Sequence, residues 1–161
     1  MSDARIEGYA RALFEIARAE GNLDEVEDEL FRFARSYESS DALRSALTDD
    51  MVPADRRQAI VESLLGDRAT ATTMQLVSMV IGSGRGRDLP EIIDSLVARA
   101  SASKDLAVAE VRTAVALSDD QVNRLKAALT NSSGREVNLK VVIDPTVIGG
   151  VVATEIGRAH V

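Results

Sequence analysis

The chain has 161 residues, of which 45 % are hydrophobic and 28 % charged, enough for one ordinary domain or two small ones. Its net charge of −7 disfavours nucleic acid as a partner, because phosphate binding depends on clusters of Lys and Arg. The lack of cysteine excludes disulfides and thiolate chemistry, and no apolar run reaches the ~20 residues that a membrane-spanning helix needs.

The first two-thirds of the chain have the periodicity of helices. Ile6, Ala10, Leu13 and Ala17 recur at steps of three and four residues, which predicts a helix that ends near Gly21. We expect a second helix to start at Asn22, with Glu25 completing a capping box. The third covers Asp41–Leu47, the fourth starts at Pro53 and ends at Gly66, the fifth runs over Ala69–Ile81, and the sixth opens at Leu89-Pro90-Glu91.

The pattern changes near Leu106. Residues 107–113 alternate between apolar and other side chains, which predicts a strand, and residues 137–143 do the same. Between them, Ser118 and Gln121 form a capping-box signature for a helix. The predicted fold is therefore mainly α, with an N-terminal six-helix bundle (residues 1–104) followed by a small α/β module of β-α-β order (residues 105–154).

Four short motifs stand in order along these elements. They are Tyr9-Ala10-Arg11-Ala12-Leu13-Phe14; Ser83-Gly84-Arg85 followed by Leu89-Pro90-Glu91-Ile92; Val111, Ala114, Leu117 and Ser118; and Asp144-Pro145 followed by Ile148-Gly149-Gly150. In this order they resemble the delta subunit of the rotary ATP synthase, called the oligomycin-sensitivity-conferring protein in mitochondria. The resemblance covers residues from about 5 to 154.

The resemblance implies a non-catalytic stalk subunit without a cofactor. It implies that the bundle contacts the catalytic head and that the second module contacts the membrane-anchored b subunit. The link between head and b subunit is then expected to resist the torque of the rotor. It also implies a monomer within the complex, at the cytoplasmic face of a bacterial membrane and not inserted into it. In the family, a groove between the first and fifth helices receives the N-terminal helix of an α subunit. We place these residues near that groove: Ala10, Leu13, Phe14, Met74, Val77 and Ile81.

From the residues alone, ordinary bundle core is the favoured interpretation of those two helices, although Tyr9, Ala12 and Ile16 form a second line on the first. A generic helical adaptor for another amphipathic helix is the alternative function. The Gly82–Arg87 segment has three glycines and two arginines and is a weak phosphate-site candidate, because it lacks the Gly-Lys-Ser/Thr ending of a P-loop. A plain turn between helices is the favoured interpretation.

Three further features carry little chemistry. The acidic pairs Asp49-Asp50 and Asp119-Asp120 have no evident third metal ligand, and we expect no metal site. Gly149-Gly150 is expected to be a bulge or close backbone approach within a strand. We expect Glu155–Val161, which includes the single histidine His160, to be a non-native tail translated from a sequencing adapter, and the module to lack its closing strand and final helix.

Overall fold

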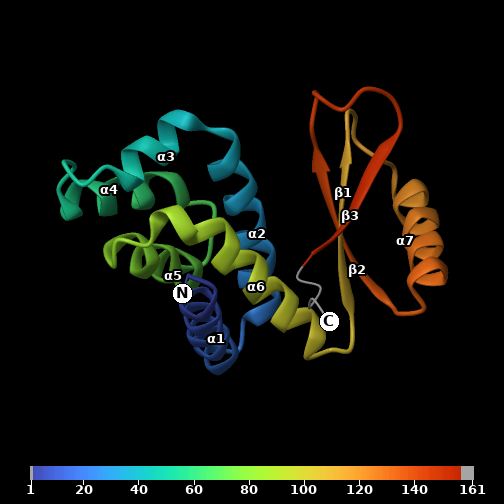
Figure 1. The fold of residues 1–161 in the computed structure, drawn as a ribbon, viewed down its shortest axis with the longest axis horizontal. Coiled ribbons are helices and arrows are strands. Elements are labelled where there is room, and N and C mark those ends of the chain that lie inside the picture. Colours follow the sequence, from blue (N-terminus) through green and yellow to red (C-terminus); the bar gives the residue numbers. More distant parts are fainter. Residues whose placement is uncertain (1, 157–161) are drawn as a thin grey trace. The chain divides into compact units, whose positions relative to one another are not determined.

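The structure, a computed structural model, describes residues 2–156, and burial of side chains from residue 4. The chain divides into two compact units, Met1–Ala100 and Ser101–Val161. The helical elements of the first part are α1 (Ser2–Glu20), α2 (Leu23–Ser39), α3 (Asp41–Thr48), α4 (Ala54–Leu65), α5 (Ala71–Gly82), the short 3₁₀ turn η1 (Gly86–Asp88) and α6 (Leu89–Ala102) (Figure 1). The second unit holds β1 (Ala107–Thr113), α7 (Asp119–Ser133), β2 (Val137–Ile143) and β3 (Val151–Ile156). The predicted fold class, mainly α with a small α/β module, is confirmed.

The core of the first unit is built mainly from aliphatic side chains, together with the buried aromatic residues Phe31, Phe33 and Tyr37 of α2. The helix α5 contacts α1, α2 and α4. Its buried residues recur in adjacent pairs every four positions and so lie on one broad face, whereas the opposite side of the helix is exposed or half-buried; the all-round burial of a central helix is not seen. The buried residues of α5 are Thr72, Thr73, Leu76, Val77, Val80 and Ile81. The predicted stripe of α1 is buried as well, with Ile6, Ala10, Leu13 and Ala17 each at most 6 % exposed.

The start of α2 differs from the prediction. Asn22 occupies the position before the helix, but its side chain makes no capping hydrogen bond, so the predicted capping box with Glu25 is wrong. The Asn22 Nδ2 instead donates to Thr72 Oγ1 at 3.1 Å. A partner 50 residues away has replaced the local cap, and it ties the start of α2 to the first turn of α5.

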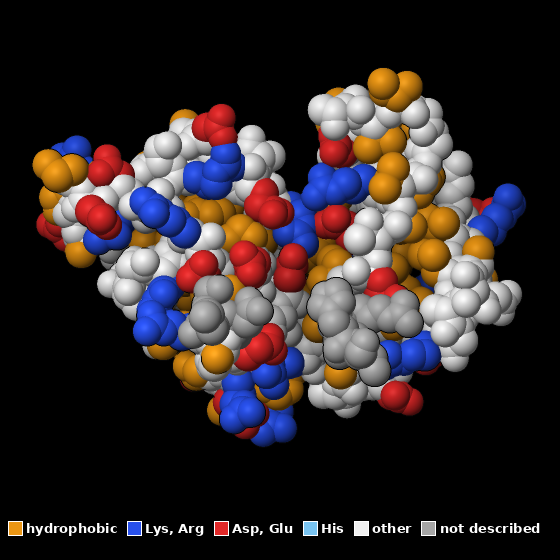
Figure 2. All heavy atoms as spheres, in the orientation of Figure 1, with side chains coloured by type: hydrophobic (Ala, Val, Ile, Leu, Met, Phe, Trp, Pro, Cys, Tyr) orange, Lys and Arg blue, Asp and Glu red, His pale blue; other side chains and the backbone are white. Residues whose placement is uncertain are grey.

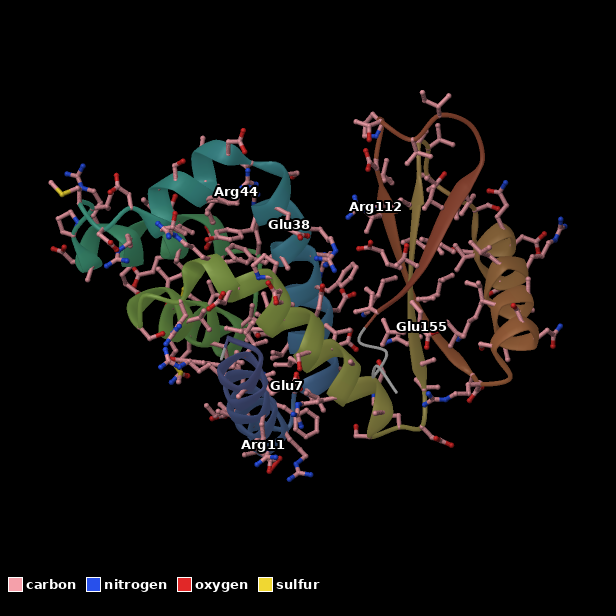
Figure 3. The ribbon with its side chains drawn as sticks, viewed as in Figure 1. Glu7, Arg11, Glu38, Arg44, Arg112 and Glu155 are labelled. Carbon is pink, nitrogen blue, oxygen red and sulfur yellow. The ribbon has the colours of Figure 1, made fainter. Side chains whose placement is uncertain are left out.

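Polar contacts also join the outer helices of this unit. Glu7 of α1, labelled in Figure 3, is one of the residues that make them. It accepts hydrogen bonds from Ser95 Oγ at 2.5 Å and from Arg99 Nη2 at 3.2 Å, both on α6. Arg35 of α2 forms an ion pair with Asp94 at 2.5 Å, again on α6. These contacts join α1 and α2 to α6. Those that are exposed to solvent each contribute little to the stability of the fold.

The second unit is a three-stranded mixed sheet in the order β2-β1-β3. β1 pairs in parallel with β2 through the crossover helix α7, and antiparallel with β3. The predicted β-α-β order and the capping box of α7, formed by Ser118 and Gln121, are confirmed. The expectation that the module lacks a closing strand is wrong, because β3 pairs with β1 over six residue pairs, from Val108–Ile156 to Thr113–Val151.

The glycine pair before β3 also differs from the prediction. Gly149 and Gly150 have φ of 65° and 71° and precede the strand, and nothing lies within 4 Å of a Cβ placed on either. They supply the left-handed backbone of a turn, so the predicted bulge or close approach within a strand is wrong. Of the expected non-native tail, Glu155 and Ile156 belong to β3, whereas residues 157–161, including His160, lie outside the described residues.

The sheet combines buried charges with exposed apolar side chains. Arg112 of β1 is held between Glu110 Oε2 and Asp144 Oδ2, each at 3.2 Å. Figure 2 shows hydrophobic side chains gathered over the strands of this unit. The exposed large ones are Val115, Val141, Ile143, Ile148, Val151 and Val152.

Candidate interaction surface on the helical bundle

The surface of α1 carries partly exposed apolar residues on both sides of its buried stripe. Successive helical residues are about 100° apart, so Phe14 lies on one side of the stripe and Tyr9 and Ile16 on the other. All three are half-buried. The Arg18 guanidinium lies over the Phe14 ring, 5.5 Å from its centroid, and Arg18 also forms an ion pair with Glu15 at 2.6 Å. Phe14 is therefore covered in part by its own helix.

The surface of α5 is arranged in the same way. Met74 is half-buried on one side of the buried face, and Met79 is 44 % exposed on the other. An unbranched thioether side chain adapts to irregular apolar partners, so exposed methionines suit a helix-binding surface. The helix α5 lies in contact with α1 (Figure 1).

The six residues predicted for the groove separate into two kinds. Ala10, Leu13, Val77 and Ile81 are at most 2 % exposed, so in this conformation they belong to the core of the bundle. Phe14 and Met74 remain partly exposed. Periodicity identifies the apolar stripe of a helix, but it does not tell which of two apolar lines the fold itself buries. Met79 was missed for the same reason.

The motif residues are distributed over both units. Tyr9 and Ala12 lie on the partly exposed side of α1, and Leu89 with Pro90 opens α6, where Leu89 is buried. Gly84, with φ of 79°, and Arg85 form the turn after α5. Asp144 and Pro145 start the connection from β2 to the Gly149-Gly150 turn. Apart from Tyr9 and Ala12, which lie within α1, these positions are turns and a helix start, which indicates that they specify the path of the chain.

The loop after α5 is a short turn that continues into η1, as expected for a connection between helices. Gly84 and Gly86 nonetheless line a small pocket there with Arg57 and Arg87. Elsewhere the acidic pairs stay isolated: in the described part of the chain no group of three or more His, Cys, Asp or Glu side chains could hold a metal ion. No helix among the described residues has the length and apolar character needed to cross a bilayer.

A network of polar side chains that sequence patterns did not indicate lies between α2 and α5. Glu29 of α2 accepts hydrogen bonds from Thr73 Oγ1 at 2.7 Å, Thr70 Oγ1 at 2.9 Å and the Thr70 backbone N–H at 3.1 Å. Burial raises the pKa of Glu29, but these hydrogen bonds together with nearby Arg32 hold it below its ordinary value. The carboxylate therefore stays ionised at the positive end of α5.

Partly exposed apolar side chains on two adjacent helices are a feature that an amphipathic partner helix can bind. The family model described as ATP synthase delta (OSCP) subunit matches residues 6–158. The chain belongs to this family, which is a structural, non-catalytic subunit of ATP synthase. The predicted resemblance is confirmed.

Curated relatives named ATP synthase subunit delta show the same relationship. The protein of Streptomyces avermitilis is 49 % identical over 135 residues, which is 84 % of this chain and 50 % of the relative. That of Acidothermus cellulolyticus is 41 % identical over 152 residues, 94 % of this chain and 56 % of the relative. The chain thus spans about half the length of the curated relatives it matches.

A solved structure supports the fold. A chain of the Toxoplasma gondii mitochondrial ATP synthase hexamer aligns with 91 % of this chain and 83 % of its own length, at a TM-score of 0.61 and 18 % identity. At that identity the likeness concerns the fold alone.

Proposed function

We propose that this chain acts as a peripheral-stalk subunit of a proton-translocating ATP synthase, bound at the membrane only through its partners. The observation that carries the proposal is the family match over residues 6–158, which includes both units. In this role the helical unit binds the catalytic head, and the sheet unit binds the membrane-anchored b subunit. The head is then held still against the rotor, so that rotation of the shaft drives the conformational cycle of the catalytic sites.

The helical unit would receive the N-terminal helix of an α subunit along the seam between α1 and α5. Phe14 and Ile16 of α1 and Met74 and Met79 of α5 support this placement, because each of them keeps apolar surface exposed outside the core of the bundle. Burying apolar area contributes roughly 25 cal/mol per Å2, from which the entropy cost of association is subtracted. A few large side chains that become fully buried on binding would supply most of the affinity.

The test is binding of the full chain to purified catalytic head, with an α-subunit N-terminal peptide as competitor. Tight binding that the peptide displaces supports the proposal. Phe14→Asp and Ile16→Asp are a matched pair on opposite sides of the α1 stripe, and the one that faces the groove should weaken binding by at least about tenfold. Leu13→Asp is unsuitable, because Leu13 is 2 % exposed and its change would unfold the bundle.

The opposite result has a clear meaning. If both variants keep the helical circular dichroism of the parent and bind the head equally well, the groove does not lie along α1. If the parent itself does not bind the head but binds an unrelated amphipathic peptide, the generic adaptor is the better description. Binding of the b-subunit soluble segment, measured separately, tests the role of the sheet unit.

A further inference from the structure

A pocket of about 160 Å3 lies in the helical unit where α3, α4 and the loop after α5 meet. Two guanidinium side chains line it, Arg57 from α4 and Arg87 from η1. The one acidic side chain among the lining residues is Asp50, from the connection between α3 and α4. The lining therefore carries one excess positive charge, in a chain whose net charge is −7.

The shape of the pocket is fixed by close packing beneath it. A Cβ on Gly86 would lie 3.1 Å from Ile81 Cδ1, 3.2 Å from Thr48 Cγ2 and 3.3 Å from the Leu47 carbonyl oxygen, so the loop comes as near to α3 as a glycine allows. The buried Tyr37 hydroxyl donates a hydrogen bond to the Gly86 carbonyl oxygen at 2.7 Å. These contacts fix the position of the Gly86 backbone, and with it the start of the Arg87 side chain.

The Arg57 side chain has a hydrogen-bond donor without an acceptor. Its Nε is buried, and no residue in the described part of the chain accepts a hydrogen bond from it. Neither Arg57 nor Arg87 forms an ion pair within residues 2–156, whereas their neighbour Arg85 has Asp88 at 3.8 Å. A guanidinium keeps its charge at every physiological pH, and a buried donor without an acceptor is costly.

We propose that this pocket binds a small oxyanion, a carboxylate or a phosphate group, through Arg57 and Arg87. A guanidinium presents parallel N–H donors that match two oxygens of either anion. At about 160 Å3 the pocket has room for one such group. None of the lining residues belongs to α1 or α5, and anion binding here does not depend on the proposed stalk function.

The experiment follows the Arg57 Nε–Hε and the Gly84 and Gly86 amide signals of the full chain by NMR. Inorganic phosphate is titrated at constant ionic strength against chloride. A short blocked peptide with a single Glu, and its Gln counterpart, form a second arm. We expect a saturable shift with phosphate or with the Glu peptide, and the arm that binds more tightly identifies the source.

Four variants make the result decisive. Arg57→Gln and Arg87→Gln should each weaken binding by about tenfold, the loss of one charge-assisted contact. Asp50→Asn should tighten it, because it removes the opposing carboxylate. Arg56→Gln changes an exposed arginine next in sequence that does not line the pocket, and it should leave binding unchanged. Circular dichroism confirms that each variant is folded.

Two results would overturn the proposal. One is a shift at Arg57 that does not saturate with either anion. The other is binding that folded Arg57→Gln retains while Arg56→Gln loses it, which would mean adventitious attraction to surface arginines.

Discussion

Glu29→Gln tests whether the carboxylate that α2 places at the start of α5 stabilises the helical unit. The substitution keeps the size of the side chain but removes its charge, leaving one oxygen as an acceptor for Thr70 and Thr73. Hydrogen bonds to a charged group contribute about 1.5–3 kcal/mol, against about 0.5–1.5 for neutral ones. The favourable interaction with the helix macrodipole adds roughly 0.3–1 kcal/mol. We therefore expect Glu29→Gln to lower the free energy of unfolding of the helical unit by about 1–2 kcal/mol at neutral pH.

The assay is thermal unfolding followed by tyrosine fluorescence. The chain has two tyrosines, Tyr9 and Tyr37, and no Trp, so this signal reports only on the helical unit. For a unit of about 100 residues, 1 kcal/mol corresponds to roughly 4–8 °C in Tm. Glu25→Gln, on the exposed face of the same helix, is the matched control. It also removes a carboxylate from a helix start, but one outside the Thr70 and Thr73 network, so it should lower Tm only by the smaller macrodipole share.

The pH dependence has a defined sign. Because the pKa of Glu29 lies below its ordinary value of 4.5 in the folded state, its contribution is fully present above that value. The contribution is lost as pH falls through the lowered pKa. The stability difference between the parent and Glu29→Gln should thus be constant from pH 6 to 7 and shrink towards pH 3. Two results would refute the reasoning. One is an equal loss of stability in Glu29→Gln and Glu25→Gln, and the other is a stability difference between the parent and Glu29→Gln that stays the same at acid pH.

Three further changes test single contacts. Gly86→Ala should lower the free energy of unfolding by about 1–3 kcal/mol, because the added methyl group meets packed atoms at 3.1–3.3 Å. Gly82→Ala is its control, because a methyl group there meets nothing within 4 Å and should not destabilise the chain. Thermal unfolding measures both. Ser118→Ala removes half of the α7 capping box and should lower the unfolding free energy of the sheet unit by about 1 kcal/mol, measured by hydrogen exchange of α7 amides. The pKa of Asp144 is lowered, chiefly by hydrogen bonds from the Thr146 side chain and backbone and further by Arg112, so Thr146→Val should raise it in an NMR titration. An unchanged titration of Asp144 would show that Thr146 is not the cause.

The sequence patterns predicted those elements whose signals are local. The α7 cap is an example, because both of its hydrogen bonds join Ser118 and Gln121, three residues apart. The cap expected at Asn22 failed because its partner, Thr72, comes from another helix. A short-range motif states what a side chain can do, and the tertiary fold decides which of the available partners it takes.

The same limit applies to β3 and to the candidate groove. The strand begins after a glycine pair whose turn was interpreted as an interruption within a strand, and its pairing with β1 spans about 40 residues. In the bundle, the apolar periodicity of the first helix includes both Leu13 and Phe14. The structure nevertheless buries Leu13 and leaves Phe14 partly exposed. Burial against other helices, which periodicity does not contain, separates core residues from surface ones.

The strand order β2-β1-β3 has a consequence for synthesis on the ribosome. Residues Met1–Ala100 form a compact unit of their own, so this unit can fold while the rest of the chain is still being made. β1, by contrast, is the central strand and needs two partners that are translated later, β2 and then β3. Its backbone hydrogen bonds stay incomplete until residue 156 has emerged, which leaves a growing chain with a finished bundle and an open strand edge.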